Sequence, residues 1–386
     1  MNKPRVWFSV SCLVTLASCA GEPFRAAPAE DEPPPAGATL PAFHTVGPPS
    51  LAGVPKAELA FARKGQSQVA AFDPVSGAVR STTVVGEVVL DLVRDGDRLL
   101  VATSTEQLDA SEIRAFRVTE GKLELLGESE PLGPGARVFP FPPHTLVLTE
   151  DMAVTWSLLD AELALVPSSK AVARPASLVL TRAQGRSRLL ALSRTGLEAG
   201  QYFDMLIEAD FESGWQLDLH SVPAPGRPSS RLGRAPDRDE VYLVRKQADE
   251  DSLEVGELSA TEPAPPKSFR NVPVPGGIGS IEAVEVDPER EALLVLLSRE
   301  ASTAALVVVP LREGVAPQLV PLAAPVEASE WFSRVLSLSA SGRVLVATAS
   351  GLEAFELGGD PAAPLLVIDT DFDGAGLAAP LVGAED

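Results

Sequence analysis

Cysteine is almost absent from this chain. The sequence of 386 residues holds two cysteines, Cys12 and Cys19, and both lie near its start. Residues 20–386 therefore cannot form a disulfide, a thiolate metal site or a cysteine nucleophile. The fold must depend on the burial of apolar side chains, which are plentiful at 45% of the sequence.

Aromatic residues and histidines are also scarce. Phe, Trp and Tyr make up 5% of the chain, too few for the stacking platforms that bind single-stranded nucleic acid. The three histidines, His44, His144 and His220, are widely separated in sequence, which argues against a histidine metal cluster or a catalytic triad. His144 follows two prolines at an expected turn and His220 ends an expected strand, so we interpret each as a surface histidine or one with its hydrogen bonds satisfied, and not as a ligand.

Short motifs of common enzyme sites are missing. The sequence contains no GxSxG, HExxH, P-loop or GxGxxG. The glycine-rich segment 276–279 is followed by no helical pattern that could present an N-terminal dipole to a phosphate, so we interpret it as a turn between repeats. Asp91, Asp95 and Asp97 are interpreted as solvated residues of charged turns. Spacing alone does not identify a general acid and base among such carboxylates.

Basic residues are in the minority. The chain has 32 Lys and Arg against 53 Asp and Glu, a formal net charge of −21. Such a protein repels nucleic acid and anionic lipid headgroups. We therefore expect no nucleic-acid partner.

The first nineteen residues resemble the signal of a bacterial lipoprotein. Lys3 and Arg5 precede an apolar segment of eleven residues, Val6–Leu16, which runs into Ala17-Ser18-Cys19. A membrane-spanning helix needs about 18–20 apolar residues, so this segment is too short to span. The cysteine at this distance favours a lipoprotein signal over an ordinary secretory one. The resemblance implies removal of residues 1–18 and acylation of Cys19 with diacylglycerol and fatty acids such as palmitate.

Lipidation at Cys19 predicts a protein attached to a membrane of the cell envelope without crossing it, because several acyl chains anchor a protein firmly. Ala20, in place of Asp, resembles lipoproteins released to an outer membrane, so we favour the outer over the inner membrane and leave the leaflet open. Loss of the two cations among residues 1–18 would change the formal charge from −21 to −23.

Residues 19–54 are expected to form a linker. Eight prolines lie between Ala20 and Ser50, together with the acidic run Glu30-Asp31-Glu32. At roughly 3.1 Å per residue in an extended polyproline conformation, about thirty residues could reach roughly 90 Å. A disordered tail without a length requirement is the equal alternative.

A strand-only repeat fills residues 55–386. Short apolar runs rich in Val and Leu recur at intervals of 40, 47, 43, 52, 52 and 51 residues, beginning at Leu59, Leu99, Leu146, Leu189, Val241, Leu293 and Val344. Repeats of forty to fifty residues made of strands are typical of β-propeller blades. We predict an all-β fold, a propeller of seven four-stranded blades with six or eight as alternatives. A pair of β-sandwiches is the competing interpretation.

The clearest repeats have four strands each. In the sixth repeat the expected strands are Ile281–Val286, Leu293–Leu297, Ala305–Val309 and Gln318–Leu322; in the seventh they are Ser333–Leu338, Val344–Ala347, Leu352–Leu357 and Pro364–Ile368. The first repeat shows only Leu59–Ala62, Val69–Phe72 and Val79–Val84. Because a closed ring has no free edge, we expect its innermost strand from Gly376–Val382 or from residues just before Val54.

Two segments resemble repeats of bacterial propellers. Residues 72–79, Phe-Asp-Pro-Val-Ser-Gly-Ala-Val, are similar to the hairpin of quinoprotein-like propellers, in which Asp, Pro and Gly form the turn. Residues 351–357, with Asp360-Pro361 and residues 364–367, resemble the LVIVD-type repeat. The resemblance implies the propeller fold alone, since these repeats carry no catalytic residue.

One acidic string suggests a metal. Asp369, Asp371 and Asp373 alternate before Gly374, as carboxylates do in calcium loops. The twelfth position of an EF-hand loop would be Pro380, which cannot supply a bidentate carboxylate. Two interpretations of this string are therefore kept: a partial calcium site and an acidic turn without an ion.

Three functions fit these observations. We favour a non-catalytic scaffold that binds another envelope protein, by analogy with propeller lipoproteins that act as bacterial assembly factors. An enzyme or small-ligand binder that uses the central funnel, as in lactonase-like or lyase-like propellers, is the second hypothesis, and a calcium-stabilised surface protein is the third. Charged residues that converge at a funnel mouth would favour the second.

Overall fold

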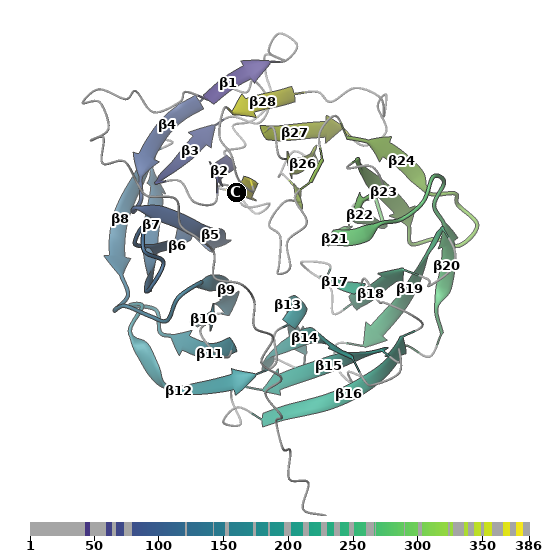
Figure 1. The fold of residues 1–386 in the computed structure, drawn as a ribbon, viewed down its shortest axis with the longest axis horizontal. Coiled ribbons are helices and arrows are strands. Elements are labelled where there is room, and N and C mark those ends of the chain that lie inside the picture. The colour runs from purple at the N-terminus through teal and green to yellow at the C-terminus, as the bar shows by residue number, and fades with distance from the viewer. Residues whose placement is uncertain are drawn as a thin grey trace, which may run out of the picture. The chain divides into compact units, whose positions relative to one another are not determined.

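The computed structural model describes residues 43–46 and most of residues 59–380, with gaps in loops and chain connections. Residues 41–386 form one compact unit. The described secondary structure of this unit is entirely β: its strands form seven antiparallel sheets, and Figure 1 shows these sheets arranged around a ring. The unit is a seven-bladed β-propeller, as the repeat predicted. Among the described residues there is no helix of the length and apolar character that crossing a membrane requires.

Each sheet contains one blade of four strands, given from the centre outward, and the sheet of blade 7 has one further strand. Blade 1 consists of β29 (Gly376–Pro380), β2 (Leu59–Arg63), β3 (Gln68–Phe72) and β4 (Val79–Val84). Blade 2 consists of β5 (Val88–Asp95), β6 (Arg98–Ser104), β7 (Ser111–Thr119) and β8 (Lys122–Glu128). Blade 3 consists of β9 (Arg137–Phe141), β10 (His144–Glu150), β11 (Val154–Leu159) and β12 (Leu165–Val172).

The remaining blades follow the same order. Blade 4 consists of β13 (Pro175–Ala183), β14 (Arg186–Gly196), β15 (Tyr202–Asp210) and β16 (Gln216–Ala224). Blade 5 consists of β17 (Ser230–Arg234), β18 (Glu240–Lys246), β19 (Ser252–Ser259) and β20 (Arg270–Pro273). Blade 6 consists of β21 (Ser280–Asp287), β22 (Ala292–Ser298), β23 (Ala304–Pro310) and β24 (Gln318–Pro321). Blade 7 consists of β25 (Leu336–Leu338), β26 (Arg343–Thr348), β27 (Gly351–Glu356) and β28 (Leu366–Thr370).

The C-terminal strand closes the ring. β29 pairs antiparallel with β2, from Leu59 opposite Pro380 to Arg63 opposite Gly376. It also contacts the inner strands of both neighbouring blades, β5 and β25. The prediction that the missing innermost strand of the first repeat comes from Gly376–Val382 is thus confirmed, and its N-terminal alternative is not used.

A short strand lies within the segment expected to be a linker. β1 (Phe43–Val46) pairs antiparallel with β28 and becomes the fifth strand of blade 7. Figure 1 shows β1 beside β28 at the outer rim. Segments near both ends of the chain therefore join the sheets at the ring junction, one in blade 1 and one in blade 7. The rest of the predicted linker, residues 19–54, and the predicted signal, residues 1–18, lie outside the described residues.

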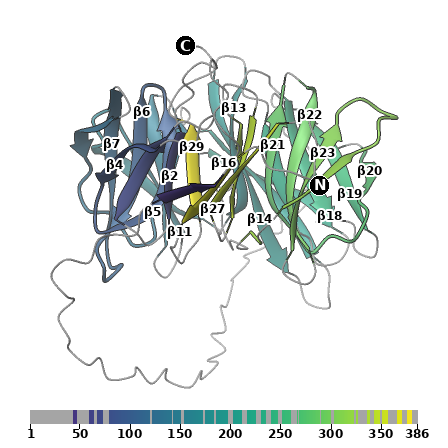
Figure 2. The same cartoon turned by 90° about the horizontal axis from the view of Figure 1, so that it is seen from above.

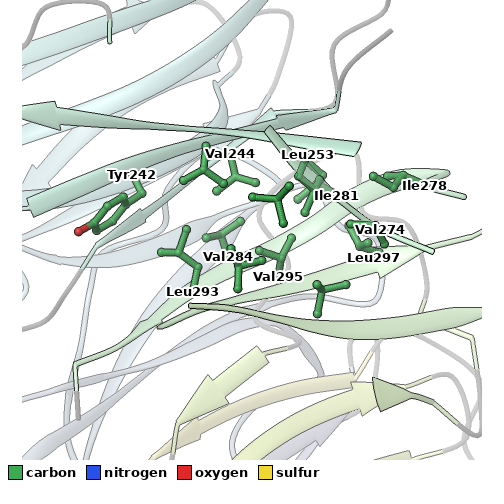
Figure 3. Close-up of a cluster of buried hydrophobic side chains, with 14 of the residues drawn as sticks. Tyr242, Val244, Leu253, Val274, Ile278, Ile281, Val284, Leu293, Val295 and Leu297 are labelled. Carbon is green, nitrogen blue, oxygen red and sulfur yellow. The ribbon is translucent and has the colours of Figure 1, made fainter. Parts of the chain in front are cut away.

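The core lies between blades. The second strand of blade 6 is apolar throughout from Ala292 to Leu297, and all six residues are buried. Alternate side chains of a strand point to opposite faces. Leu293, Val295 and Leu297 therefore pack with blade 5, as Figure 3 shows, whereas Leu294 and Leu296 pack with blade 7. Burial of both faces explains why the apolar repeat marks the second strand of every blade.

Turns between blades use glycine where the backbone requires it. Val274–Gly279 connects β20 to β21, which confirms the interpretation of residues 276–279 as a turn between repeats. Gly276 and Gly277 have φ values of +85° and +84°, a backbone conformation that residues other than glycine rarely adopt. Arg299 holds this turn by donating from its guanidinium to the carbonyl oxygens of Pro275 and Gly277.

Candidate functional site

Asp91 is a buried carboxylate on an inner strand. It lies in β5 directly after a bulge at Leu90, and 3% of its surface is exposed. One carboxylate oxygen accepts a hydrogen bond from the backbone N–H of Leu92 at 3.0 Å, and the other accepts one from the N–H of Val138 in β9, also at 3.0 Å. The prediction that Asp91 is a solvated turn residue is wrong, because the carboxylate joins blade 2 to blade 3. Asp97 is exposed as expected.

A second contact between blades 2 and 3 is made by an arginine of blade 3. Arg137, the first residue of β9, is buried, and its guanidinium donates to the carbonyl oxygen of Leu90 at the β5 bulge. A bulge leaves the carbonyl of the extra residue without a partner in its own sheet. Arg137 supplies that partner, so the bulge and the arginine together connect two inner strands.

Blades 5 and 6 repeat this arrangement. Arg231 in β17 is buried, and its Nε donates to the carbonyl oxygen of Glu282 at 3.2 Å. Glu282 occupies a bulge of β21, and its carboxylate accepts a hydrogen bond from the Ser280 hydroxyl. A buried arginine again reaches the bulge of an adjacent inner strand.

These hydrogen bonds indicate whether the buried charges of the inner strands are available for catalysis. Asp91, Arg137, Arg231 and Glu282 are all buried, and each takes part in hydrogen bonds that fix the backbone within or between blades. A general acid or base must instead reach substrate. In the part of the inner ring that the structure describes, these four residues therefore support the assembly of the blades.

The residues predicted to bind metal or lipid are placed only in part. Asp369 lies in β28, opposite Gly351 on one side and His44 on the other. Asp371, Asp373 and Cys19 lie outside the described residues. The described side chains include no cluster of three or more His, Cys, Asp or Glu that could hold a metal ion. A calcium site at the acidic string stays a prediction, which a calcium-dependent melting shift that Asp371→Ala removes would support and no shift in the parent would end.

The three histidines lie in three different blades. His44 is in β1 beside blade 7, His144 begins β10 in blade 3, and His220 is in β16 of blade 4. The three histidines therefore belong to three different sheets.

The exposed apolar residues are at the periphery. Within the described part of the chain, the large apolar side chains classed as exposed all lie on outer strands or in connecting loops: Val84, Leu108, Leu125, Leu126, Leu165 and Val315. Leu108 differs from the others because its φ is +57°, in the left-handed region. It lies in the loop between β6 and β7, amid Glu106, Gln107 and Asp109, which are also exposed. Sequence reasoning missed this loop, since one leucine in a polar loop gives no signal of its backbone conformation.

No protein-family model matches the sequence, and no curated protein matches it. Solved structures do match. A protein of unknown function from Desulfotomaculum acetoxidans DSM 771 has a TM-score of 0.61 at 10% identity, over 84% of this chain and 99% of that one. A putative 6-phosphogluconolactonase from Bacteroides uniformis ATCC 8492 has a TM-score of 0.58 at 12% identity, over 84% and 99%. The periplasmic gluconolactonase of Pseudomonas aeruginosa has a TM-score of 0.56 at 16% identity, over 83% and 97%.

At these identities the similarity shows the fold alone. Each match covers nearly the whole of the other protein, so the likeness extends around the ring. A propeller carries many unrelated functions, and a lactonase activity would have to be argued from residues of this chain.

Proposed function

We propose that this chain is a lipid-anchored protein of the cell envelope whose propeller binds another envelope protein and catalyses no reaction. The main support for the proposal is that the buried charged side chains and the exposed apolar side chains lie in different parts of the propeller. Four buried charged residues of the described inner strands, Asp91, Arg137, Arg231 and Glu282, take part in contacts between blades, whereas exposed apolar residues lie on outer strands and loops. Strand β4, which carries the exposed Val84, contacts β8, which carries the exposed Leu125 and Leu126, and apolar residues gathered on adjoining outer strands favour contacts with a protein over chemistry in the funnel.

The tether follows from the sequence of the N-terminal segment. Lipidation at Cys19 would leave residues 20–42 before β1, which pairs with the outer strand of blade 7. At roughly 3.1 Å per residue, these 23 residues would span at most about 70 Å. The bilayer contacts this protein through the acyl chains on Cys19, and the acidic ring itself is repelled by anionic headgroups.

The lactonase-like neighbours suggest the second hypothesis, an enzyme or ligand binder that uses the funnel. The four buried inner-strand charges Asp91, Arg137, Arg231 and Glu282 do not favour it, because they are bonded between blades. The scaffold is therefore the function that this geometry supports best.

Chemical cross-linking in intact cells tests the scaffold. The full-length protein is cross-linked, purified and analysed by mass spectrometry beside a Cys19→Ser variant expressed at the same level. We expect a reproducible envelope protein with the parent and its loss with the variant. Abundant, membrane-bound parent protein that captures no partner would overturn the proposal.

A further inference from the structure

The loop between β6 and β7 has an unusual backbone conformation at its apolar residue. Leu108 has a φ of +57°, and half of its surface (50%) is exposed. The left-handed conformation is unfavourable for an L-residue, and only Gly, Asn and Asp adopt it routinely. With half of its surface exposed, Leu108 gains only part of the packing that a fully buried leucine contributes. Fold stability alone therefore does not explain Leu108.

Hydrogen bonds hold this loop in one conformation. The N–H of Leu108 donates to the carbonyl of Thr105 at 3.0 Å, and the Thr105 hydroxyl donates to the Asp109 carboxylate at 2.8 Å. The Ser104 hydroxyl also donates to the carbonyl of Ala110. A loop that is already ordered loses less conformational entropy when it binds a partner. Leu108 is thus presented in a fixed position.

The surroundings of Leu108 are acidic. Glu106 and Asp109 flank it in the loop, and the N–H of Glu106 donates to the carboxylate of Glu87 at 3.0 Å, which brings a third acid to this end of blade 2. The half-buried cation nearby, Arg114, donates to the carbonyl of Val85 and pairs with Glu112 and Glu128. Its charge is balanced within the protein. An anionic membrane surface would be repelled from this end of the blade.

We infer that the β6–β7 loop is the docking element for the protein partner, with Leu108 as the apolar anchor. The partner has an apolar pocket that receives Leu108, and Lys or Arg side chains around the pocket face Glu87, Glu106 and Asp109. This inference rests on the proposed scaffold function. A side chain that fills a fully desolvated pocket can carry a large share of the energy of an interface, and complementary charges around the pocket speed association and select the partner.

A photo-cross-linking residue in place of Gln107 tests the inference in intact cells with the full-length protein. Gln107 is exposed and adjacent to Leu108. We expect a single partner band, with the cross-linked peptide rich in apolar and cationic residues. Leu108→Asn should lower the yield by about tenfold or more, although asparagine suits this backbone and the variant should melt no lower than the parent. Leu108→Gly serves as a second variant.

Val315 supplies the matched control. It is equally exposed, at 55%, but lies in the β23–β24 connection. In a four-stranded antiparallel blade, this connection is at the opposite end from the loop between the second and third strands. Val315→Asn should therefore leave the yield at position 107 unchanged. Glu106→Lys should lower the yield and Glu313→Lys should not.

The outcomes separate the two proposals. A Leu108→Asn variant that cross-links as well as the parent would overturn the docking loop. So would a partner found by general cross-linking that never attaches through position 107, and in both cases the scaffold function would stand. A parent protein that captures no partner by either method would overturn the scaffold and the docking loop together.

Discussion

Asp91 makes a testable contribution at the scale of single residues. Its two carboxylate oxygens each accept a backbone N–H, one within β5 and one from Val138 of the next blade. In Asp91→Asn an amide NH2 must face one of these N–H donors, and the group is buried. We predict a loss of about 2–3 kcal/mol in the free energy of unfolding, measured by urea denaturation.

The exposed Asp97 is the control for this measurement. Asp97→Asn should change stability by less than about 0.5 kcal/mol, as surface substitutions usually do. Equal unfolding midpoints for Asp91→Asn and Asp97→Asn would contradict the role given to Asp91.

Gly276, in the turn between β20 and β21, should not tolerate a side chain. Its φ is +85°, and a Cβ there would lie 2.0 Å from Nη2 of Arg299, the nitrogen that donates to Pro275. Gly276→Ala should lower the free energy of unfolding by roughly 1–3 kcal/mol, from backbone strain and displacement of the arginine. Gly127→Ala, where no atom lies within 4 Å of the added Cβ, should be neutral or slightly stabilising. The melting temperatures of both variants test this prediction. A Gly276→Ala variant that melts like the parent would show that this turn does not require glycine.

These residues also show where the sequence stops being informative. Asp91 depends on a bulge and on a partner 47 residues away, and neither leaves a local pattern. Leu108 depends on a backbone angle that a polar loop does not reveal. Gly276 was easier to interpret, because a glycine-rich turn signals left-handed backbone directly.

Among the strands, β29, which closes the ring, should contribute most clearly to stability. β29 provides five residue pairs to β2, and about five ladder hydrogen bonds at about 0.5–1.5 kcal/mol each correspond to roughly 3–7 kcal/mol. A chain that ends at Ala375 should therefore unfold at a much lower denaturant concentration, with a broader transition. A chain that ends at Pro380 should match the parent. If both truncated chains unfold like the parent, β29 does not close the ring.

The strands themselves were predictable to different degrees. All seven repeat positions from Leu59 to Val344 fall in the second strand of their blade, because that strand is buried on both faces and its apolar run is continuous. β29 has the sequence Gly-Leu-Ala-Ala-Pro, which lacks any strand signature, and only the need to close the ring pointed to it. β1 was not predicted, since its four residues lie in a proline-rich segment.

At the scale of the whole molecule, the fold and the net charge have consequences for function. Figure 2 shows the blades side by side around the ring axis, so loops gather at the two faces and outer strands form the rim. A formal charge of −21 gives this surface a general preference for cationic partners. The proposed scaffold and docking loop both require the proposed lipid tether, which would hold this acidic ring beside a membrane that otherwise repels it.

Fatty-acid labelling of the full-length protein tests that tether most directly. Cells that express the parent or Cys19→Ser are grown with an alkyne-bearing palmitate, and the mature N-terminus is determined by mass spectrometry. We expect label in the membrane fraction, a mature chain that begins at Cys19, and loss of both in the variant. An unlabelled parent that is released in soluble form would contradict this expectation.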